Sequence, residues 1–408
     1  MQVFLLFTFD LSVTIKLIIT MIRALWLTSW YPNRLDTQNG DFIQRHAKAA
    51  SLYCKVDVIH IEPDKENKLT QPTERNCKTE GNLSETIVLY KLSNIPFLGK
   101  IISWLRYIHI FKKEILCYIK NNGLPNVVHV HVPVKAGLLA LWLKRKYKIS
   151  FIITEHWNIY KSPAKDEFGK RNFLFRYYSK KIFRAAALFL PVSNDLGRRV
   201  CETVGDVKYE AVPNCADVNI FYLKEDIKAE EFTFIHASTF NYPKNPEAIL
   251  KSFIVFNKKN PSTRLLMLGE IPQQLQEFIS KENISSYKKI IFTGLVPYSE
   301  VAKKMQQSHT LLMYSRYENL PCVVLEALCC GLPVISSAVG GIPEIVAEKN
   351  GILLNKYSEE CLVNEMENMF VNYSKFNQQK ISMDAADKFS YPSVGKMIVS
   401  KYEKLMEA

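Results

Sequence analysis

Two carboxylates, Glu318 and Glu326, flank the start of a predicted helix in the stretch YENLPCVVLEALCCGLPVI, which spans residues 317–335. Proline favours the first position of a helix, so Pro321 should begin it and Glu326 should lie about one and a half turns along. Because Glu326 is surrounded by apolar residues, its carboxylate is expected to have a partner. Carboxylates accept hydrogen bonds in pairs, and vicinal sugar hydroxyls supply them in pairs. The alternative is a solvated loop charge at Glu318 and a polar helix face at Glu326.

Three segments of the second half share one order: a predicted strand, a short loop and a proline at a helix start. The loops hold Lys244 with a capping Asn245, then Glu318 with Asn319, and last Gly340 with Gly341. In an open parallel sheet, such helix starts meet at the edge where ligands bind. Their N–H groups and dipoles favour phosphate, and Lys244 adds a full positive charge. Together the three corners indicate a nucleotide diphosphate, although ordinary capping would explain any one of them.

The carboxylate spacing fits a nucleotide sugar laid over a helix start. One acid would hold a ribose diol and the other a sugar hydroxyl. The backbone N–H groups of Asn319, Leu320 and Cys322 would reach phosphate and sugar oxygens.

The elements that must position these residues are short apolar runs alternating with amphipathic stretches. Strands are expected to start near residues 24, 56, 86, 126, 150, 187, 209, 232, 263, 290, 310, 333 and 351. Continuously apolar strands separated by helices are typical of parallel sheets buried on both faces. The predicted fold class is therefore α/β, with two Rossmann-like, doubly wound domains facing a cleft. The polar segment 64–82 is expected to be a mobile loop.

A chain of 408 residues is too long for one core, so two domains are expected. We predict a first domain over 21–213, a linker over 214–231, a second domain over 232–390 and a final helix over 391–408 that packs back on the first domain. Residues 1–20 are apolar but interrupted by charges and lack the features of a secretory signal. We interpret them as an appended or misassigned start, with a weak membrane-surface anchor as the alternative.

Composition limits the partners and the compartment. Lys and Arg outnumber Asp and Glu by 53 to 40, which favours an anionic partner such as nucleic acid, a lipid surface or a phosphorylated substrate. Nine cysteines without a CxxC pair argue against a disulfide framework or zinc site and for a reducing compartment. We therefore expect a cytoplasmic protein.

Basic and aromatic residues interleave in three segments of the first half, namely 104–113, 144–148 and 161–184. Such faces can lie on anionic membranes, which suits a lipid-linked acceptor and peripheral contact at the inner membrane face. They also suit single-stranded nucleic acid, but no nucleic-acid motif accompanies them, so we expect no such partner. A merely solvated basic face is the remaining alternative.

The stretch YENLPCVVLEALCCGLPVISSAVGGIPEIV resembles the E-x7-E signature of retaining nucleotide-sugar glycosyltransferases of family 4, which have the GT-B fold. Further segments resemble that family in order: SWYPNRLDTQNGDFIQRHAKAA, HVHV, ITEHWNIY, VSNDL, VPNCADVNIF and FTGLVPYSEVAKKM. The resemblance implies a hexosyltransferase that moves a sugar from a nucleotide-diphosphate donor to a glycan or lipid-linked acceptor in surface polysaccharide biosynthesis.

The resemblance also implies roles for single residues of the second half. Glu326 would bind the ribose, Glu318 would contact the donor sugar near its reacting face, and Lys244 would neutralise the diphosphate. The backbone around Gly294 and Leu295 would hold the base.

In the first half, the loop with Gly40 would close over the diphosphate and His156 would face the donor sugar. By composition alone His156 would be a structural histidine, and His129 and His131 are interpreted so, although His131 could line the cleft. The family's usual arginine before the lysine is missing from ASTFNYPK. Ser238 there can only donate a hydrogen bond, so Arg316 or a first-domain residue would supply the second positive charge.

The resemblance implies chemistry that needs no metal and no cofactor beyond the donor itself. The sequence, which has no DxD pair of aspartates, is consistent with this. Lys244 and helix dipoles would stabilise the leaving phosphate. Retention then implies same-face attack or a covalent intermediate on Glu318. The alternatives are a nucleotide-sugar 2-epimerase of the same fold and a non-catalytic module that binds nucleotide sugar.

Overall fold

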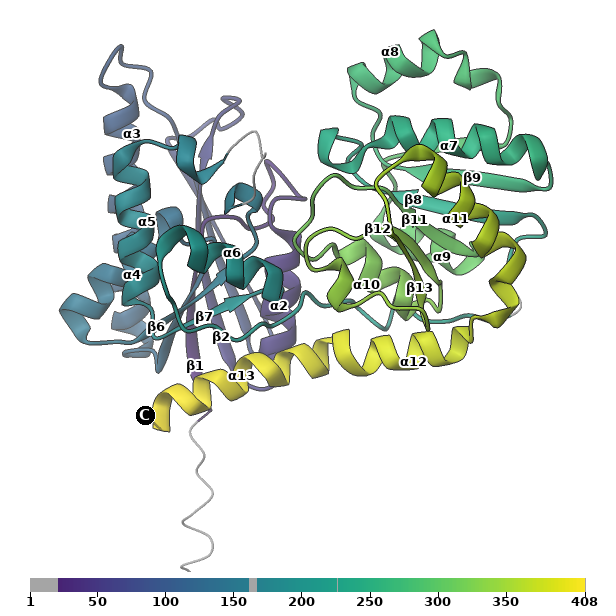
Figure 1. Ribbon diagram of the computed structural model, residues 1–408. Coiled ribbons are helices and arrows are strands. Elements are labelled where there is room, and N and C mark those ends of the chain that lie inside the picture. Colours follow the sequence, from purple (N-terminus) through teal and green to yellow (C-terminus); the bar gives the residue numbers. More distant parts are fainter. Residues whose placement is uncertain (1–20, 161–166, 226, 408) are drawn as a thin grey trace, which may run out of the picture.

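The computed structural model describes residues 21–160, 167–225 and 227–407, which form two α/β lobes side by side (Figure 1). We refer to residues 21–213 as the first lobe and to residues 232–390 as the second lobe. The expectation for residues 1–20 lies outside the described residues, as does the part of the basic segment over 161–166.

The first lobe is built on a seven-stranded sheet in the order β3-β4-β2-β1-β5-β6-β7. Its strands are β1 (Arg23–Thr28), β2 (Lys55–Asp64), β3 (Thr73–Glu80), β4 (Leu83–Lys91), β5 (Val127–His131), β6 (Phe151–Glu155) and β7 (Leu188–Pro191). Its helices are α2 (Asp41–Ser51), α3 (Gly99–Asn122), α4 (Pro133–Tyr147), α5 (Phe173–Ala185) and α6 (Asn194–Val204). All neighbouring strands are parallel except β3, which confirms the doubly wound fold.

Two local predictions for this lobe are wrong. Residues 73–80, expected in a mobile loop, form β3, which pairs antiparallel with β4 at the sheet edge. An edge strand with exposed polar side chains needs no apolar face, so its sequence carries no burial pattern. Tyr209 begins no strand and makes only an isolated bridge with Phe189.

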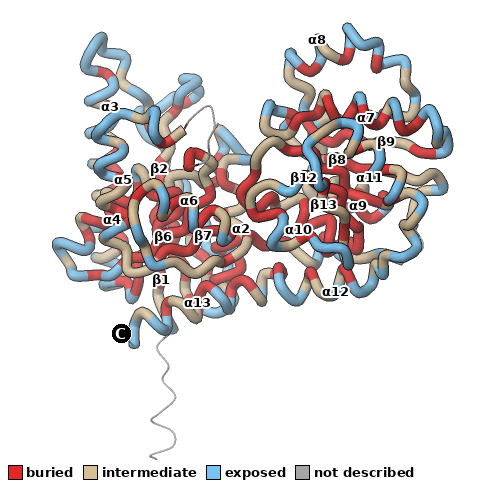
Figure 2. The backbone as a smooth tube through the Cα atoms, in the orientation of Figure 1, coloured by how far each residue is buried: buried red, intermediate tan, exposed pale blue. Residues whose placement is uncertain are grey.

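The second lobe is built on a six-stranded parallel sheet in the order β10-β9-β8-β11-β12-β13. Its strands are β8 (Phe232–Ala237), β9 (Thr263–Leu268), β10 (Ile290–Gly294), β11 (Thr310–Met313), β12 (Val334–Ser337) and β13 (Gly351–Leu354). Its helices are α7 (Pro246–Lys259), α8 (Gln273–Lys281), α9 (Tyr298–Gln307), α10 (Cys322–Cys329), α11 (Glu359–Asn372) and α12 (Gln378–Phe389). Buried residues follow both sheets (Figure 2).

The three expected helix starts differ from one another. Helix α7 begins at Pro246, but Asn245 caps it with no side-chain hydrogen bond and instead donates to the Tyr357 hydroxyl at 2.9 Å. Helix α10 begins one residue after Pro321. The third corner holds only a 3-10 turn, Ile342–Glu344. Two helices, rather than three, therefore begin at these corners.

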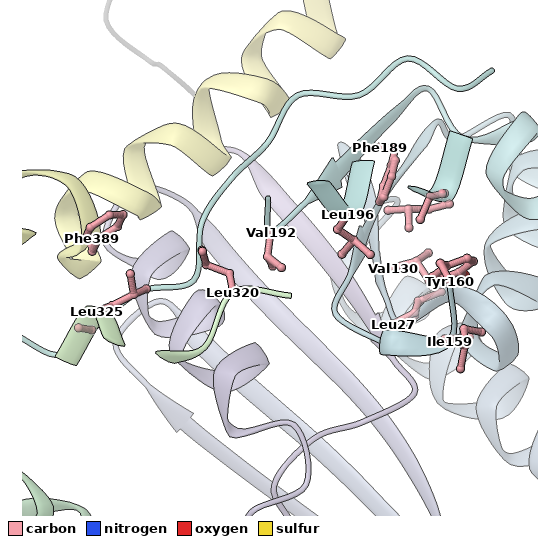
Figure 3. Packing of buried hydrophobic residues seen from close by; sticks show 14 of the residues in the cluster. Leu27, Val130, Ile159, Tyr160, Phe189, Val192, Leu196, Leu320, Leu325 and Phe389 are labelled. Carbon is pink, nitrogen blue, oxygen red and sulfur yellow. The ribbon is translucent and has the colours of Figure 1, made fainter. Parts of the chain in front are cut away.

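The last helix, α13 (Tyr391–Glu407), leaves the second lobe and packs along α2 of the first (Figure 1). Its Tyr402 hydroxyl lies 2.7 Å from Nδ1 of His129. An apolar cluster also runs from one lobe into the other, with Val192 and Leu196 of the first lobe and Leu320 and Leu325 of the second among its members (Figure 3). No helix of the described residues has the length and apolar composition that a membrane crossing requires.

Candidate functional site

Glu318 lies in the loop after β11 and pairs with the lysine that the sequence placed at the neighbouring corner. Its Oε1 accepts from Nζ of Lys244 at 2.6 Å and from the Ser315 hydroxyl at 2.8 Å. Glu318 is only 5% exposed, so it is not a solvated loop charge. Lys244 closes the 3-10 turn Tyr242–Lys244 directly before α7. The two corners thus share one buried, charge-assisted contact.

Glu326 sits on α10, is only 4% exposed and faces the first lobe. Its Oε1 accepts from the Tyr298 hydroxyl at 2.7 Å and from the guanidinium of Arg45 on α2. Arg45 also donates to Asp41, one turn earlier, and stacks over the Tyr298 ring at 4.5 Å. The apolar helix therefore carries a carboxylate because a cation from the other lobe meets it there, and the polar-face alternative for Glu326 is wrong.

Arg45 is a site residue that the sequence did not reveal. Asp41 and Arg45 are four residues apart, the spacing of an ordinary ion pair within one helix, so Arg45 does not stand out in the sequence. The contact with Glu326 joins residues 281 positions apart, and no local pattern encodes it.

The segment after Glu318 is held between the lobes. The Asn319 side-chain amide donates to the carbonyl oxygen of His156 at 2.7 Å, and the Asn319 carbonyl accepts from the Gly341 N–H at 2.7 Å. The Leu320 carbonyl accepts from the Asn214 amide at 2.7 Å. Cys322 begins α10, and burial raises the pKa of its thiol to about 12, so it is no thiolate nucleophile.

The Gly40 loop and His156 meet in the first lobe. Gly40 has a left-handed φ of 69°, and a Cβ there would lie 2.8 Å from the carbonyl carbon of Trp30, so a side chain would not fit. Phe42, two residues on, packs against the His156 ring with centroids 4.5 Å apart. Burial, and then the nearby His46, hold the pKa of His156 well below its usual range. His156 is therefore neutral at pH 7.

Glu155 is a second residue near the site that was not predicted from the sequence. Its Oε1 accepts from the N–H groups of His156 and Trp157 at 2.8 and 2.9 Å, and its Oε2 accepts from the Tyr160 hydroxyl at 3.1 Å. Burial raises the pKa of Glu155 to about 7. The signal was available, because a carboxylate at the end of a buried strand beside His156 stands out in FIITEH.

Three buried histidines, His46, His131 and His156, bring ligand atoms within 4.8 Å of one another. Nε2 of His46 lies 3.0 Å from the carbonyl oxygen of Pro213, which can only accept, so Nε2 carries the proton and Nδ1 keeps its lone pair. Both ring nitrogens of His131 lack a hydrogen-bond partner among the described residues. Imidazole nitrogens bind zinc and similar ions, so within the described ranges this is the one cluster able to hold a metal.

The remaining predicted residues lie around this centre. Ser238 directly follows β8. Its hydroxyl oxygen accepts a hydrogen bond from the Phe240 N–H and also contacts the His236 ring, so both of its partners lie in the second lobe. Arg316 donates to the Tyr242 carbonyl and stacks on the Tyr242 ring at 4.2 Å.

The segment predicted to hold the base lies just before Tyr298, which contacts Glu326. Gly294 ends β10 with a left-handed φ of 70°, and the following Leu295 is exposed. Tyr298, which donates to Glu326, comes three residues after Leu295. The Gly294–Leu295 turn therefore lies three residues before a side chain that binds the second carboxylate, Glu326.

A cavity of about 660 Å³ opens between the lobes. Arg198 and Arg199 of α6 line it from the first lobe, and Arg316 and Gly340 line it from the second. Glu344, also in the lining, accepts the N–H groups of Asn194 and Asp195 at the start of α6. The predicted cleft is therefore present. Its lining combines arginines with the acids Asp195 and Glu344, and Arg316 is the predicted site residue that borders it.

Comparisons with known proteins agree across the chain. Residues 87–220 match the family model "Glycosyltransferase Family 4" and residues 221–382 match "Glycosyl transferases group 1". An uncharacterized glycosyltransferase of Methanocaldococcus jannaschii is 26% identical over 68% of this chain and 73% of its own length. A putative teichuronic acid biosynthesis glycosyltransferase of Bacillus subtilis is 22% identical over 84% of this chain and 87% of its own length.

Solved structures share the fold. Sucrose-phosphate synthase from Thermosynechococcus elongatus superposes with a TM-score of 0.74 at 17% identity, over 95% of this chain and 99% of that one. Anabaena HepE, solved with UDP and glucose, superposes with a TM-score of 0.67 at 13% identity, over 94% of this chain and 100% of that one.

Proposed function

The chain belongs to the family 4-type glycosyltransferases of the GT-B fold, and on this premise we propose that it transfers a hexose from a nucleotide-diphosphate sugar with retention of configuration. The observation that carries this proposal is the pair of buried carboxylates, Glu318 and Glu326, each bound to a cation at the edge where the lobes meet. Anabaena HepE, which shares the fold, has been solved with UDP-glucose. This supports a nucleotide-sugar donor.

In the proposed complex, the diphosphate lies at Lys244 and the start of α7, and the ribose diol is held by Glu326. A ribose that binds Glu326 must replace or share its contact with Arg45. Arg45 is then released beside the donor, where its charge can face the diphosphate. This makes Arg45 the leading first-lobe residue to supply the second positive charge, with Arg316 as the alternative from the second lobe.

We propose that the reaction proceeds by same-face attack. The bond from the anomeric carbon to the diphosphate oxygen breaks, the acceptor oxygen bonds to that carbon on the same face, and the departing phosphate oxygen takes the acceptor proton. Glu318 is bound by Lys244 and Ser315, which lowers its strength as a nucleophile and argues against a covalent intermediate. Neutral His156 can accept a hydrogen bond from a sugar hydroxyl. Lys244 and the helix start at α7 supply the positive charge that the leaving group requires.

The proposed acceptor is a growing surface glycan or a lipid-linked oligosaccharide on the cytoplasmic face of the membrane. The relative from teichuronic acid biosynthesis supports a polysaccharide role. Arg198 and Arg199, which share Asp195 as a partner, line the cavity between the lobes and could bind phosphate or carboxylate groups of an acceptor.

A thermal-shift panel of nucleotide sugars, followed by transfer assays with the best donor, tests this proposal. A glycosyltransferase should be stabilised by one nucleotide sugar and should form a product whose anomeric signal in NMR matches that of the donor. Inversion of that signal would refute retention. Conversion of the free donor to its 2-epimer would identify an epimerase, and binding without any turnover would identify a non-catalytic module.

Independence from metal is proposed as well, and the histidine cluster makes it worth testing directly. The protein should keep its transfer activity after dialysis against a chelator, and elemental analysis should find no stoichiometric transition metal. Activity that requires an added divalent ion, or one bound zinc per chain that is lost when His131 is replaced by Ala, would contradict the metal-free mechanism.

A further inference from the structure

The start of α3 and the loop before it expose large apolar side chains at one end of the first lobe. Most of the backbone there has the colour of exposed residues in Figure 2. The side chains that are more than half exposed are Ile95, Phe97, Leu98, Ile101 and Leu105. The loop has a fixed shape, because the Gly99 N–H donates to the Ile95 carbonyl and the Ser93 N–H donates to the Ser103 hydroxyl. We call residues 92–106 the tip.

Phe97 serves no purpose within the folded lobe. Its side chain is fully exposed, and its backbone has a φ of 60°, a region that disfavours a bulky residue. Asparagine or glycine would suit this backbone better. A phenylalanine held out in water on an unfavourable backbone therefore indicates a contact with something outside the chain.

The start of α5 adds a second apolar surface at the same end of the lobe. Phe173, Leu174 and Tyr177 are exposed there. Helices α3 and α5 follow the carboxyl ends of β4 and β6, which lie in the same parallel part of the sheet, so both helices start at one edge. Helix α4 packs between them, and Figure 1 shows the three helices on the side of the first lobe that lies away from the second.

Both surfaces are basic and free of acid. The tip contains Lys100 and Arg106 but no Asp or Glu. Residues 168–186 contain six Lys or Arg and likewise no Asp or Glu. Exposed apolar side chains next to positive charge suit an anionic bilayer. The acyl chains can surround the apolar side chains, and the negative headgroups attract the positive charges.

An aromatic series joins α5 to the candidate site. Phe175 contacts Trp157 with ring centroids 6.2 Å apart, Arg171 stacks on both rings, and Trp157 directly follows His156. Trp157 also contacts Trp30 beside the Gly40 loop at 5.6 Å. A surface docked at α5 would therefore be connected to the place where an acceptor meets the donor.

We propose that the tip and the first turns of α5 form a membrane-docking surface that inserts Phe97, Leu98 and Ile101 among the acyl chains of an anionic bilayer. Its role in delivering a lipid-linked acceptor rests on the proposed function, whereas docking itself does not. Lys100 and Arg106 of the tip and the basic residues of 168–186 supply the headgroup contacts, and the tip supplies the inserted side chains.

Flotation of the full chain with vesicles tests the proposal. Vesicles of phosphatidylcholine alone are compared with vesicles that also contain phosphatidylglycerol. The tip variant carries Phe97→Asn, Leu98→Ser and Ile101→Ser, where asparagine suits the φ at 97 and the other two sites are exposed. The matched control carries Val371→Ser and Met383→Ser, two exposed apolar residues of the second lobe.

The parent and the control should float with the anionic vesicles, and the tip variant should partition at least about tenfold more weakly at an unchanged melting temperature. Added salt or removal of phosphatidylglycerol should also weaken the binding of the parent to the vesicles. Failure of the parent to float, or equal flotation of the tip variant, overturns the proposal. So does a parent dimer that becomes monomeric in the tip variant while flotation stays the same, because the tip would then bind a second copy.

The outcome is independent of the proposed chemistry. Nucleotide-sugar binding and turnover measured without vesicles report on the site, and flotation reports on the tip. A protein that floats through its tip but transfers no sugar would refute the proposed function alone.

Discussion

At the scale of single residues, the site is organised by ion pairs whose partners lie far apart in the chain. Glu318 depends on Lys244, and Glu326 depends on Arg45. Removing one partner of a buried pair leaves the other charge uncompensated, at a cost of about 3–5 kcal/mol. Truncation to alanine would therefore lower stability together with binding, so isosteric variants and ligand comparisons are needed to separate the two.

Glu326→Gln should abolish the preference for a ribose over a 2′-deoxyribose. The amide keeps an oxygen for Tyr298 but loses the charge that binds two hydroxyls. Calorimetry with a nucleoside diphosphate and its 2′-deoxy form should show the parent favouring the ribose by about tenfold and the variant binding both alike. A preference that persists in the variant would assign the ribose to another residue.

Lys244→Ala should weaken binding of a nucleoside diphosphate by about ten- to a hundredfold, because a charge-assisted contact with phosphate is lost. Binding of the nucleoside without phosphates should change little, which separates loss of the phosphate contact from a general disturbance of the site. Lys258→Ala, at an exposed lysine in the last turn of α7, the helix that follows Lys244, is the matched control. Equal losses for nucleoside and diphosphate would argue against the role of Lys244.

Glu155→Gln should change how stability depends on pH. The raised pKa of Glu155 means that the folded state takes up its proton near pH 7, while the unfolded chain does so near 4.5. Stability from this group therefore grows as pH falls between these values, by on the order of 3 kcal/mol. The buried histidines act in the opposite direction, but they are common to both proteins.

Denaturant unfolding of parent and Glu155→Gln from pH 8 to 5 measures this effect as a difference. As the pH is lowered, the free energy of unfolding of the parent should rise relative to that of the variant, because glutamine has no proton to take up. A difference that stays constant over this range would show that Glu155 is ionised in the folded state throughout.

At the scale of elements, the sequence predicted what local patterning controls. Buried parallel strands, the proline that starts α7 and the loop of Glu318 all followed from apolar runs and turn residues. Strand β3 could not be found in this way, because an edge strand with polar residues on both faces resembles a loop. The third corner carries the same residues as a helix start, yet it ends after one 3-10 turn.

Helix α13 illustrates an element whose docking depends on one residue. A Cβ on Gly395 would lie 2.0 Å from the backbone oxygen of Ala49 on α2, so the two helices can approach closely only with glycine there. Gly395→Ala should therefore destabilise the protein by about 1–3 kcal/mol.

The competing expectation is helix propensity, which alone would make alanine more stabilising than glycine. Thermal unfolding distinguishes the two, with Lys396→Ala on the exposed face of α13 as the control. A higher melting temperature for Gly395→Ala than for the parent would show that α13 is not held against α2 as described.

At the scale of the whole molecule, the site exists only because the lobes meet. The first lobe contributes Arg45 and the carbonyl of His156, the segment between the lobes contributes Asn214, and the second lobe contributes Glu326 and the segment after Glu318. The chemical type of most site residues could be predicted from sequence, since acids, lysine and glycines at strand ends are local features. Their partners could not, because Arg45 and Glu326 meet through tertiary folding alone.

The crystal structure of the protein with the nucleoside diphosphate that binds most tightly in a panel of UDP, GDP, ADP and dTDP is the most direct test of the site. We predict that the ribose hydroxyls, or the equivalent sugar hydroxyl, lie within hydrogen-bond distance of Glu326, that Lys244 contacts the diphosphate, and that Arg45 has left or shares its carboxylate partner. A nucleotide bound elsewhere, with Arg45 still paired to Glu326 and Lys244 still paired to Glu318, would contradict the assignment.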